Sequence, residues 1–382
     1  MNNVTDVEIQ FNSVVSLHSQ LHNQLRQLIL LGRWPHRSRL PSETQFAQHL
    51  NLSRSTVRLA LQQAEIEGLI ERSAGRGTFV AYMASKERKN RLITFVTYEF
   101  DTENHLLILN GAESEVKARG YQIVFSKAKN HQDDATTLRN FQESDTAGIM
   151  LWPNALNSQQ NAVDFQGVHL PIVLMDRNIH GFDCDFVTSD NYGGAHALMQ
   201  HLIELGHRHV IFLCHHELEL SSVGDRYRAY RDVLQETGQP PLEPWLISQP
   251  GKEPSARELL QSSIDSLSSD IQTLKNYMYS VRPVPTALFA VNDYVAVLAV
   301  RAMKALGLRV PNAVSIAGFD GTDLAMQLEV PLTTVAQDPF TIGKRAAELL
   351  INRIEGYSGP THHEIIPTQL HIRSSTSVPV RV

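Results

Sequence analysis

The sequence predicts an α/β protein in which a small N-terminal domain of helices precedes a larger domain built on doubly wound parallel sheets. Three observations predict this arrangement. The first 82 residues show helical apolar spacing that ends in a Gly-rich alternating segment, and the next nine are polar and basic without apolar periodicity. From residue 92 onward, short apolar segments alternate with helical ones. We therefore expect domains at 1–82 and 92–382, joined by a linker at 83–91.

The composition is that of a globular protein, with 42% hydrophobic and 19% charged residues. Apolar segments such as 92–96 are far shorter than the roughly 20 residues that a membrane span needs. The N-terminus is polar and carries Asp6 and Glu8, so no secretory apolar region is expected. The only two cysteines, Cys184 and Cys214, argue against a disulfide scaffold. We therefore expect a cytoplasmic protein without a membrane partner.

The charge is distributed unevenly along the chain. Residues 1–90 carry eleven Lys or Arg against seven Asp or Glu, so this part has a net charge of +4 and the remainder −10, within a total of −6. A basic domain on an acidic body indicates that only the first domain meets a polyanion such as DNA.

The N-terminal domain is predicted to contain three helices and a hairpin. Leucine and isoleucine residues at helical spacing predict a first helix over 17–31. Ser42, with a glutamine three residues later, opens a second helix, and Ser53 can cap a third. Residues 69–80 alternate as in a small hairpin. The tip Gly75-Arg76-Gly77 would let a DNA backbone approach closely while one cation reaches a groove.

The third helix is amphipathic, with an inner apolar face at offsets 0, 3, 4 and 7 from Val57. Its outer face carries Arg54, Ser55 and Arg58, and the two arginines are one turn apart in the half that enters a major groove. An arginine fork can bond guanine O6 and N7 together, or a phosphate. A solvated basic face is the common alternative. Hydroxyls for a phosphate at the helix N-terminus come from Ser53, Ser55 and Thr56.

The stretch RLPSETQFAQHLNLSRSTVRLALQQAEIEGLIERSAGRGTFVA resembles the winged helix-turn-helix of GntR-family regulators. It matches their LPSE, SR-TVR-AL, EGLI and G-GTFV pattern, and the resemblance covers roughly residues 15–82. It implies double-stranded operator DNA as a partner, with Glu43, Arg54 and Arg58 at the bases or the adjacent backbone. It also implies phosphate or wing contacts for Arg39, Ser55, Thr56, Arg76 and Gly77.

Strands and helices alternate through the second domain, which predicts a parallel, doubly wound sheet. The predicted strands lie at 92–97, 121–125, 147–151, 171–175, 186–188, 209–213, 286–290 and 314–318. The predicted helices lie at 104–118, 192–204, 226–237, 293–306 and 341–355, with a further surface helix in the Ser/Leu-rich stretch 255–270.

Polar residues directly follow several of these strands, and ligands of open α/β sheets bind beyond the carboxyl ends of strands. Asp176 and Arg177 follow one strand, Asn292 and Asp293 follow another, and Asp320 follows a third. Guanidinium, amide and carboxylate groups suit the bidentate hydrogen bonds of vicinal hydroxyls. Each residue alone is compatible with an ordinary soluble loop, but their convergence favours a ligand site. The candidates to cover the apolar face of a sugar ring are Phe100, Tyr98 and Trp152.

The second domain resembles the LacI/GalR effector domain, which is itself similar to periplasmic sugar-binding proteins. The matching segments include LPIVLMDR, DNYGGAHALMQHLIELGHRHVIFL, DRYRAYRDVLQETG and PLTTVAQDPFTIGKRAAELL, and they run from about 92 to 376. The resemblance implies two periplasmic-binding-protein-like lobes that close around a ligand, with chain crossings near 189, 321–337 and 366. It implies a monosaccharide site formed by Asp176, Arg177, Arg226, Asn292, Asp320 and Gln337.

A GntR-type head on a LacI-type effector domain is the architecture of the arabinose repressor family. This resemblance implies a homodimer that releases its operator when a monosaccharide such as arabinose binds. The hinge helix typical of LacI-type proteins is not evident in residues 81–91, so the linker would couple the domains differently.

Neither a cofactor nor a metal site is expected. His207 and His209 would share a strand face, but no third ligand with supporting spacing is evident. The sequence contains no Gly-x-Ser-x-Gly elbow or Walker loop, so we do not expect an enzyme. The alternatives that stay open are a regulator responding to a purine, nucleoside or sugar phosphate, a sugar-binding receptor, and an α/β enzyme.

Overall fold

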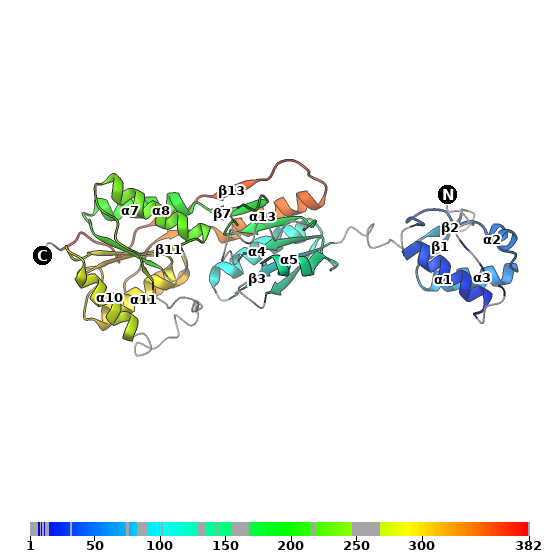
Figure 1. Cartoon of the computed structure of the whole chain (residues 1–382), viewed down its shortest axis with the longest axis horizontal. Coiled ribbons are helices and arrows are strands. Elements are labelled where there is room, and N and C mark those ends of the chain that lie inside the picture. Colours follow the sequence, from blue (N-terminus) through cyan, green and yellow to red (C-terminus); the bar gives the residue numbers. More distant parts are fainter. Residues whose placement is uncertain are drawn as a thin grey trace. The chain divides into compact units, whose positions relative to one another are not determined.

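In the computed structural model, the chain forms two units, residues 1–90 and 91–382, of which the first contains three helices and a two-stranded hairpin (Figure 1). The structure describes residues 7, 9, 11, 15–30, 33–73, 76–81, 91–98, 100, 102–128, 134–142, 144–153, 168–179, 181–214, 218–246 and 268–380. The predicted linker therefore lies almost wholly outside the described residues, and so does the predicted helix at 255–270 apart from residues 268–270, which begin a described helix.

The helices of the first unit begin where the sequence places their caps. Ser42 and Gln45 form a capping box, since the Ser42 hydroxyl accepts from the Gln45 N–H and the Ser42 N–H donates to Gln45 Oε1 at 2.8 Å. Ser53 caps the third helix by accepting from the Thr56 N–H at 3.1 Å. The elements are α1 (Leu17–Leu30), α2 (Glu43–His49), α3 (Arg54–Ile66), β1 (Ile70–Ser73) and β2 (Gly77–Val80).

The predicted inner face of α3 is buried. Val57, Ala60 and Ala64 are fully inaccessible to solvent, and Leu61 is 1% exposed. They pack in one apolar cluster with residues of α1 and with Phe46 of α2. The opposite face of α3, which carries both arginines, is therefore left to solvent.

The second unit contains two six-stranded sheets, each forming a lobe. The first lobe has the strand order β13-β7-β6-β5-β3-β4, and the second has the order β14-β12-β11-β10-β8-β9. Neighbouring strands in the described residues are parallel except β12 and β14. The first-lobe strands are β3 (Leu92–Thr97), β4 (Gln122–Lys127), β5 (Gly148–Leu151), β6 (Ile172–Met175), β7 (Asp185–Ser189) and β13 (His363–Ile366). The second-lobe strands are β8 (Val210–Cys214), β9 (Trp245–Leu246), β10 (Ala287–Ala290), β11 (Ser315–Asp320), β12 (Thr333–Ala336) and β14 (Gln369–His371).

Helices accompany both sheets (Figure 1). They are α4 (Glu103–Ala118), α5 (Asp134–Gln142), α7 (Asn191–Glu204), α8 (Ser221–Glu236), α10 (Ser268–Ser280), α11 (Asp293–Ala305), α12 (Asp323–Gln327) and α13 (Pro339–Ile354). Every residue of β5, β6, β8 and β10 is buried, as expected for parallel strands covered on both faces. Within the described residues, no helix has the length and apolar character needed to cross a membrane.

The two lobes are joined by crossings at the predicted places. In the described residues the chain passes between the sheets after Ser189, after Ala336 and after Ile366. Four strands were not predicted: β9, β12, β13 and β14. The strand β12 contains two buried threonines, so it has no apolar run that could be recognised in the sequence. The Thr334 hydroxyl can be buried because it donates a hydrogen bond to Asp293 at 2.6 Å.

Two glycines bring α4 and α13 into close contact in the first lobe. A Cβ atom at Gly111 would lie 1.9 Å from the carbonyl oxygen of Phe340, and one at Gly343 would lie 1.9 Å from that of Ile108. Any side chain at either position would force the helices apart. This contact fixes the position of α4, whose N-terminal turn lies at the carboxyl end of the sheet.

Candidate functional site

The first candidate site is the exposed face of α3 in the first unit. Arg54, Ser55 and Arg58 are all exposed there. The Ser53 hydroxyl lies 2.7 Å from that of Ser55 and 2.8 Å from that of Thr56, so three hydroxyls gather at the helix N-terminus. The helix N-terminus and these hydroxyls form a set of donors suited to a phosphate group.

Glu43 lies at the centre of an ion-pair network beside this face. Its carboxylate contacts Arg58 Nε at 3.4 Å and Arg72 Nη1 at 3.3 Å, and Arg72 also contacts Glu65 at 3.1 Å. The structure therefore places Glu43 beside Arg58, one of the two arginines expected at DNA. Arg72, on β1, was not singled out from the sequence, because its partners are distant in sequence.

The wing depends on a glycine. Gly77 has φ +117°, and a Cβ atom there would lie 2.9 Å from Arg39 Nε. The backbone of Arg39 forms a β-bridge with Phe79 of β2, and its guanidinium lies beside Gly77. Arg76 is exposed next to Gly77. Gly75 of the predicted tip lies outside the described residues.

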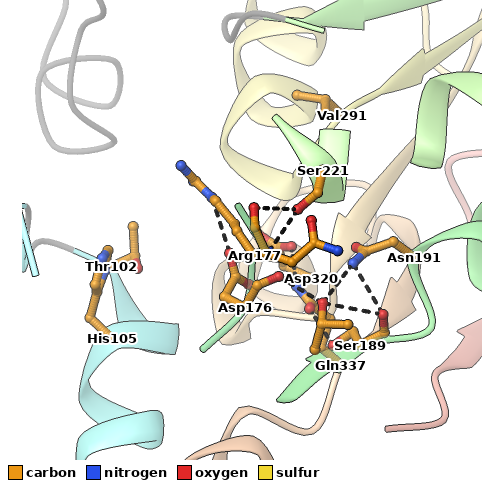
Figure 2. Close-up of polar contacts among 12 residues, drawn as sticks. Thr102, His105, Asp176, Arg177, Ser189, Asn191, Ser221, Val291, Asp320 and Gln337 are labelled. Atoms are coloured by element: carbon orange, nitrogen blue, oxygen red, sulfur yellow. Dashed lines mark hydrogen bonds and ion pairs between the residues drawn. The ribbon is translucent and has the colours of Figure 1, made fainter. Parts of the chain in front are cut away.

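The second candidate site lies between the lobes, at the carboxyl ends of the strands (Figure 2). Asp176 follows β6 with φ +68°, and Asp320 ends β11 with φ +109°. Non-glycine residues rarely adopt a positive φ, and when they do the surrounding structure must hold them there. For Asp176, the Thr188 hydroxyl donates to its backbone oxygen at 2.7 Å. The structure thus places the backbone of both predicted acidic residues at the sheet edge in a conformation that their surroundings must maintain.

Arg226 of α8 is the most buried cation of this cluster, at 6% exposure. Its Nε donates to Asn191 Oδ1 at 2.9 Å, and its Nη1 donates to the Val291 carbonyl at 2.7 Å. The same Nη1 lies 3.5 Å from Asp320 Oδ1, and the guanidinium lies 3.8 Å from the ring centroid of Phe319. Burial lowers the pKa of Arg226, while Asp320 opposes that shift.

Gln337 links Asp320 to the crossings between the lobes. Its Nε2 donates to Asp320 Oδ1 at 2.6 Å, and its Oε1 accepts from the Ser189 hydroxyl at 2.5 Å. Ser189 ends β7 in the first lobe, so this chain of hydrogen bonds spans two crossings. Burial raises the pKa of Asp320 to about 6, although Arg226 acts in the opposite direction.

The remaining predicted polar residues lie around this cluster. Arg177 pairs with Asp176, with Nε 3.2 Å from Oδ2. Asn292 caps α11 by accepting from the Val295 N–H at 2.9 Å, which leaves its amide NH2 group to donate. The structure therefore brings Asp176, Arg177, Arg226, Asn292, Asp320 and Gln337 to one end of the two sheets.

Two further polar residues belong to the cluster. Asn191, which was not predicted, is 3% exposed, accepts from Arg226 and donates to the Ser189 carbonyl at 3.1 Å. Asp293, which follows the same strand as Asn292, is fully buried and accepts from the N–H and hydroxyl of Thr322 at 2.8 and 3.1 Å. Burial raises the pKa of Asp293 to about 7. Asn191 was missed because its partner Arg226 is 35 residues away in sequence.

The aromatic candidates occupy different places. Phe100 is half-buried, with its ring edge-on to Phe125 at 4.8 Å. Trp152 stacks on His105 of α4, with 4.1 Å between ring centroids and 26° between planes. Tyr98 is buried, and its hydroxyl donates to Asp134. The structure thus places Phe100 and Trp152 around a histidine that the sequence analysis did not select.

His207, one of the two histidines considered for a metal site, makes hydrogen bonds within the protein. His207 is 1% exposed, and its ring nitrogens lie 2.8 Å from the Thr286 hydroxyl and 3.0 Å from the Ser377 carbonyl. His207 therefore connects β8 to the C-terminal segment.

Comparison with known proteins finds a match in each unit. Residues 17–80 match bacterial regulatory proteins of the gntR family, and residues 199–376 match the periplasmic binding protein-like domain. The chain joins a gntR-family domain to a periplasmic-binding-protein-like domain. It is a transcriptional regulator with a DNA-binding head.

Known proteins match most of the chain. The chain is 29% identical to an arabinose metabolism transcriptional repressor of Geobacillus stearothermophilus, over 94% of this chain and 96% of that protein. It is 26% identical to the HTH-type transcriptional repressor PurR of Aliivibrio salmonicida, over 69% and 74%. A LacI family transcriptional regulator from Mycobacterium smegmatis has the same fold, with a TM-score of 0.63 and 20% identity over 75% of this chain and all of that one.

Proposed function

We propose that the protein is a transcriptional repressor that binds operator DNA as a homodimer and is released by a neutral monosaccharide. The first candidate for this effector is L-arabinose. The observation that carries the proposal is the interlobe cluster, in which both lobes contribute polar groups to one site. A regulator of this kind acts in the cytoplasm, where its operator lies.

The charge of the cluster favours a neutral ligand. Asp176 pairs with Arg177 and Asp320 with Arg226, so each cation has a carboxylate beside it, and the buried Asp293 adds a third acidic group. A phosphate group would need cations without a carboxylate beside them. Paired carboxylates and guanidinium groups instead present acceptors and donors side by side, as the vicinal hydroxyls of a sugar require.

The choice of arabinose comes from the relatives. The Geobacillus stearothermophilus repressor, named for arabinose metabolism, matches the chain through both units. The PurR match covers 69% of the chain, and a purine effector is the alternative that it supports. An uncharged purine also satisfies the charge argument, so the effector has to be identified by binding.

The release mechanism requires coupling between the units. Helix-turn-helix dimers must match half-sites one or more helical turns apart, so a change in the spacing or freedom of the two heads lowers specific affinity. Closing the lobes around a sugar would change that spacing through the linkers. The difference between the operator affinities of the free and sugar-bound protein is the coupling free energy.

Two measurements test the proposal. A duplex selected by the full-length protein from a random-sequence pool serves as operator, and its complex is followed by fluorescence anisotropy during a salt titration. L-arabinose, other pentoses and hexoses, their phosphates and purines are then added in turn. We expect a specific complex that L-arabinose dissociates, with no effect of the phosphates. A protein that forms no sequence-specific complex, or that only purines or phosphates release, would overturn the proposal.

A further inference from the structure

Leu59 is a large apolar side chain that α3 leaves exposed to solvent. It is 53% exposed, and among the described residues it lies outside the apolar cluster in which Val57 and Ala60 of the same helix are buried. A single exposed leucine is common on protein surfaces and carries no information by itself. Its position in the helix is therefore what decides whether it has a function.

Leu59 lies in the N-terminal half of α3, which begins at Arg54 and ends at Ile66. With 3.6 residues per turn, it follows Ser55 by one turn on the face opposite the buried one. In a helix-turn-helix head, the N-terminal residues of the recognition helix contact base edges in the major groove. In that arrangement Leu59 faces the base pairs.

The groups around Leu59 favour DNA as its partner. Arg54 and Ser55 are exposed at the start of the helix, and the first unit carries a net charge of +4. The guanidinium of Arg58 contacts Glu43 of α2 at 3.4 Å, so this cation lies at the side of the helix. Leu59 is therefore an apolar position bordered by groups that bind a polyanion.

A leucine in the major groove is complementary to one base. Thymine presents a C5 methyl group there, whereas the edges of the other bases present hydrogen-bond donors and acceptors. Leucine has neither a donor nor an acceptor, so beside those edges it would displace water without replacing its hydrogen bonds. Beside thymine it buries apolar groups on both partners. The same side chain thus favours thymine and disfavours the other bases.

We propose that Leu59 is a specificity-determining residue of the DNA-binding head, whose side chain contacts the C5 methyl group of one thymine in each operator half-site. This inference rests on the operator binding of the proposed function and names a residue that selects a base by apolar contact. Arg54 and Arg58 supply charge and hydrogen bonds beside it. The α3 face would then read its site by two kinds of contact, polar and apolar.

The test compares thymine with deoxyuridine, which lacks only the C5 methyl group and keeps the same base pairing. Each thymine in one half-site of the selected operator is replaced singly, and binding of full-length wild type, L59A and I66A is followed by anisotropy. Ile66 is the matched control, because it is 86% exposed and lies two turns further along the same face, at the end of the helix away from the groove. We expect one replacement to weaken binding by wild type and I66A about fourfold, as for one buried methyl group, and to leave binding by L59A unchanged.

Further variants separate a base contact from a structural effect. L59M keeps a long apolar side chain and is expected to retain the preference for thymine. Should L59A lower the Tm, L59Q provides a second variant that is expected to lose the preference. Wild-type binding that no replacement affects, an equal penalty for wild type and L59A, or a loss in L59A that is equal on operator and unrelated duplex would overturn the inference and leave the proposed function intact. Wild-type protein that forms no sequence-specific complex would overturn both.

Discussion

The two candidate sites use the same pair of chemical groups in opposite surroundings. In the first unit the side chains of Arg58 and Glu43 are 59% and 27% exposed, and their closest atoms are 3.4 Å apart. In the second unit those of Arg226 and Asp320 are 7% and 11% exposed, at a similar 3.5 Å. Exposed pairs contribute little to stability and exchange partners easily, whereas breaking a buried pair leaves a charge without solvent or partner.

This difference separates the two functions physically. The α3 face can give up its internal ion pairs for DNA at small cost, which suits a surface that binds and releases a polyanion. The interlobe cluster is held in one arrangement by Asn191, Val291 and Gln337. A ligand there meets groups that are already oriented, so little ordering is needed on binding.

Removal of the buried cation is expected to have the largest effect. R226A leaves Asp320 buried without its guanidinium partner and leaves the Val291 carbonyl without a donor. We expect the free energy of unfolding of the second unit to fall by about 3–5 kcal/mol. Urea denaturation followed by circular dichroism measures it. A loss below about 1 kcal/mol would show that the pair behaves like an exposed one.

The raised pKa of Asp320 predicts a pH dependence of stability. The folded-state pKa is about 6 against an ordinary value of 3.8, so the folded protein binds this proton more tightly than the unfolded chain does. The contribution of Asp320 to the free energy of unfolding is therefore lost as pH rises from about 4 to about 6, by about 3 kcal/mol. The difference between wild type and D320N, measured by denaturation at each pH, isolates it. A difference that is constant over this range would contradict the prediction.

Substitution in the α3 face should affect DNA binding without affecting folding. R54A is expected to cost roughly 1–3 kcal/mol of operator binding if Arg54 reads a base, with unfolding unchanged. Anisotropy titrations with operator and with unrelated duplex separate the two possible contacts. An equal loss on both sequences would assign Arg54 to a phosphate.

The exposed ion pair should have the smallest effect on stability. E43Q removes the carboxylate between Arg58 and Arg72, and we expect unfolding of the first unit to change by less than about 1 kcal/mol. Operator affinity reports separately on the position of Arg58. Thermal unfolding at low and high salt measures the stability term, and a much larger loss at either salt would mean that the network holds the domain together.

Much of the fold could be predicted from local pattern, because burial imposes a period on the sequence. The inner face of α3 at Val57, Ala60, Leu61 and Ala64 follows directly from helical spacing, and the fully apolar β5 and β8 follow from their burial on both faces. The strand β12 escaped prediction because buried threonines look polar until Asp293 is known to bond Thr334.

Some residues of the interlobe site could likewise be predicted from local sequence pattern, and others could not. Asp176 and Asp320 could be located because they directly follow strands, whereas Arg226 came from the family resemblance alone. Its partners Asn191 and Val291 are far away in sequence, so no local pattern contains them. His105 was missed for a similar reason. Only the fold brings Trp152 against its ring, and nothing in the spacing of the helix distinguishes it from an ordinary core residue.

We propose that a sugar bound between the lobes controls DNA binding by the first unit. The most direct test is an anisotropy titration of the operator complex with L-arabinose, made with wild-type protein and with R177A. Arg177 is chosen because its ion pair with Asp176 is only partly buried, so the variant is expected to fold. We predict that both proteins bind the operator with equal affinity and that L-arabinose releases the wild type alone. Release of both proteins, or of neither, would contradict the account.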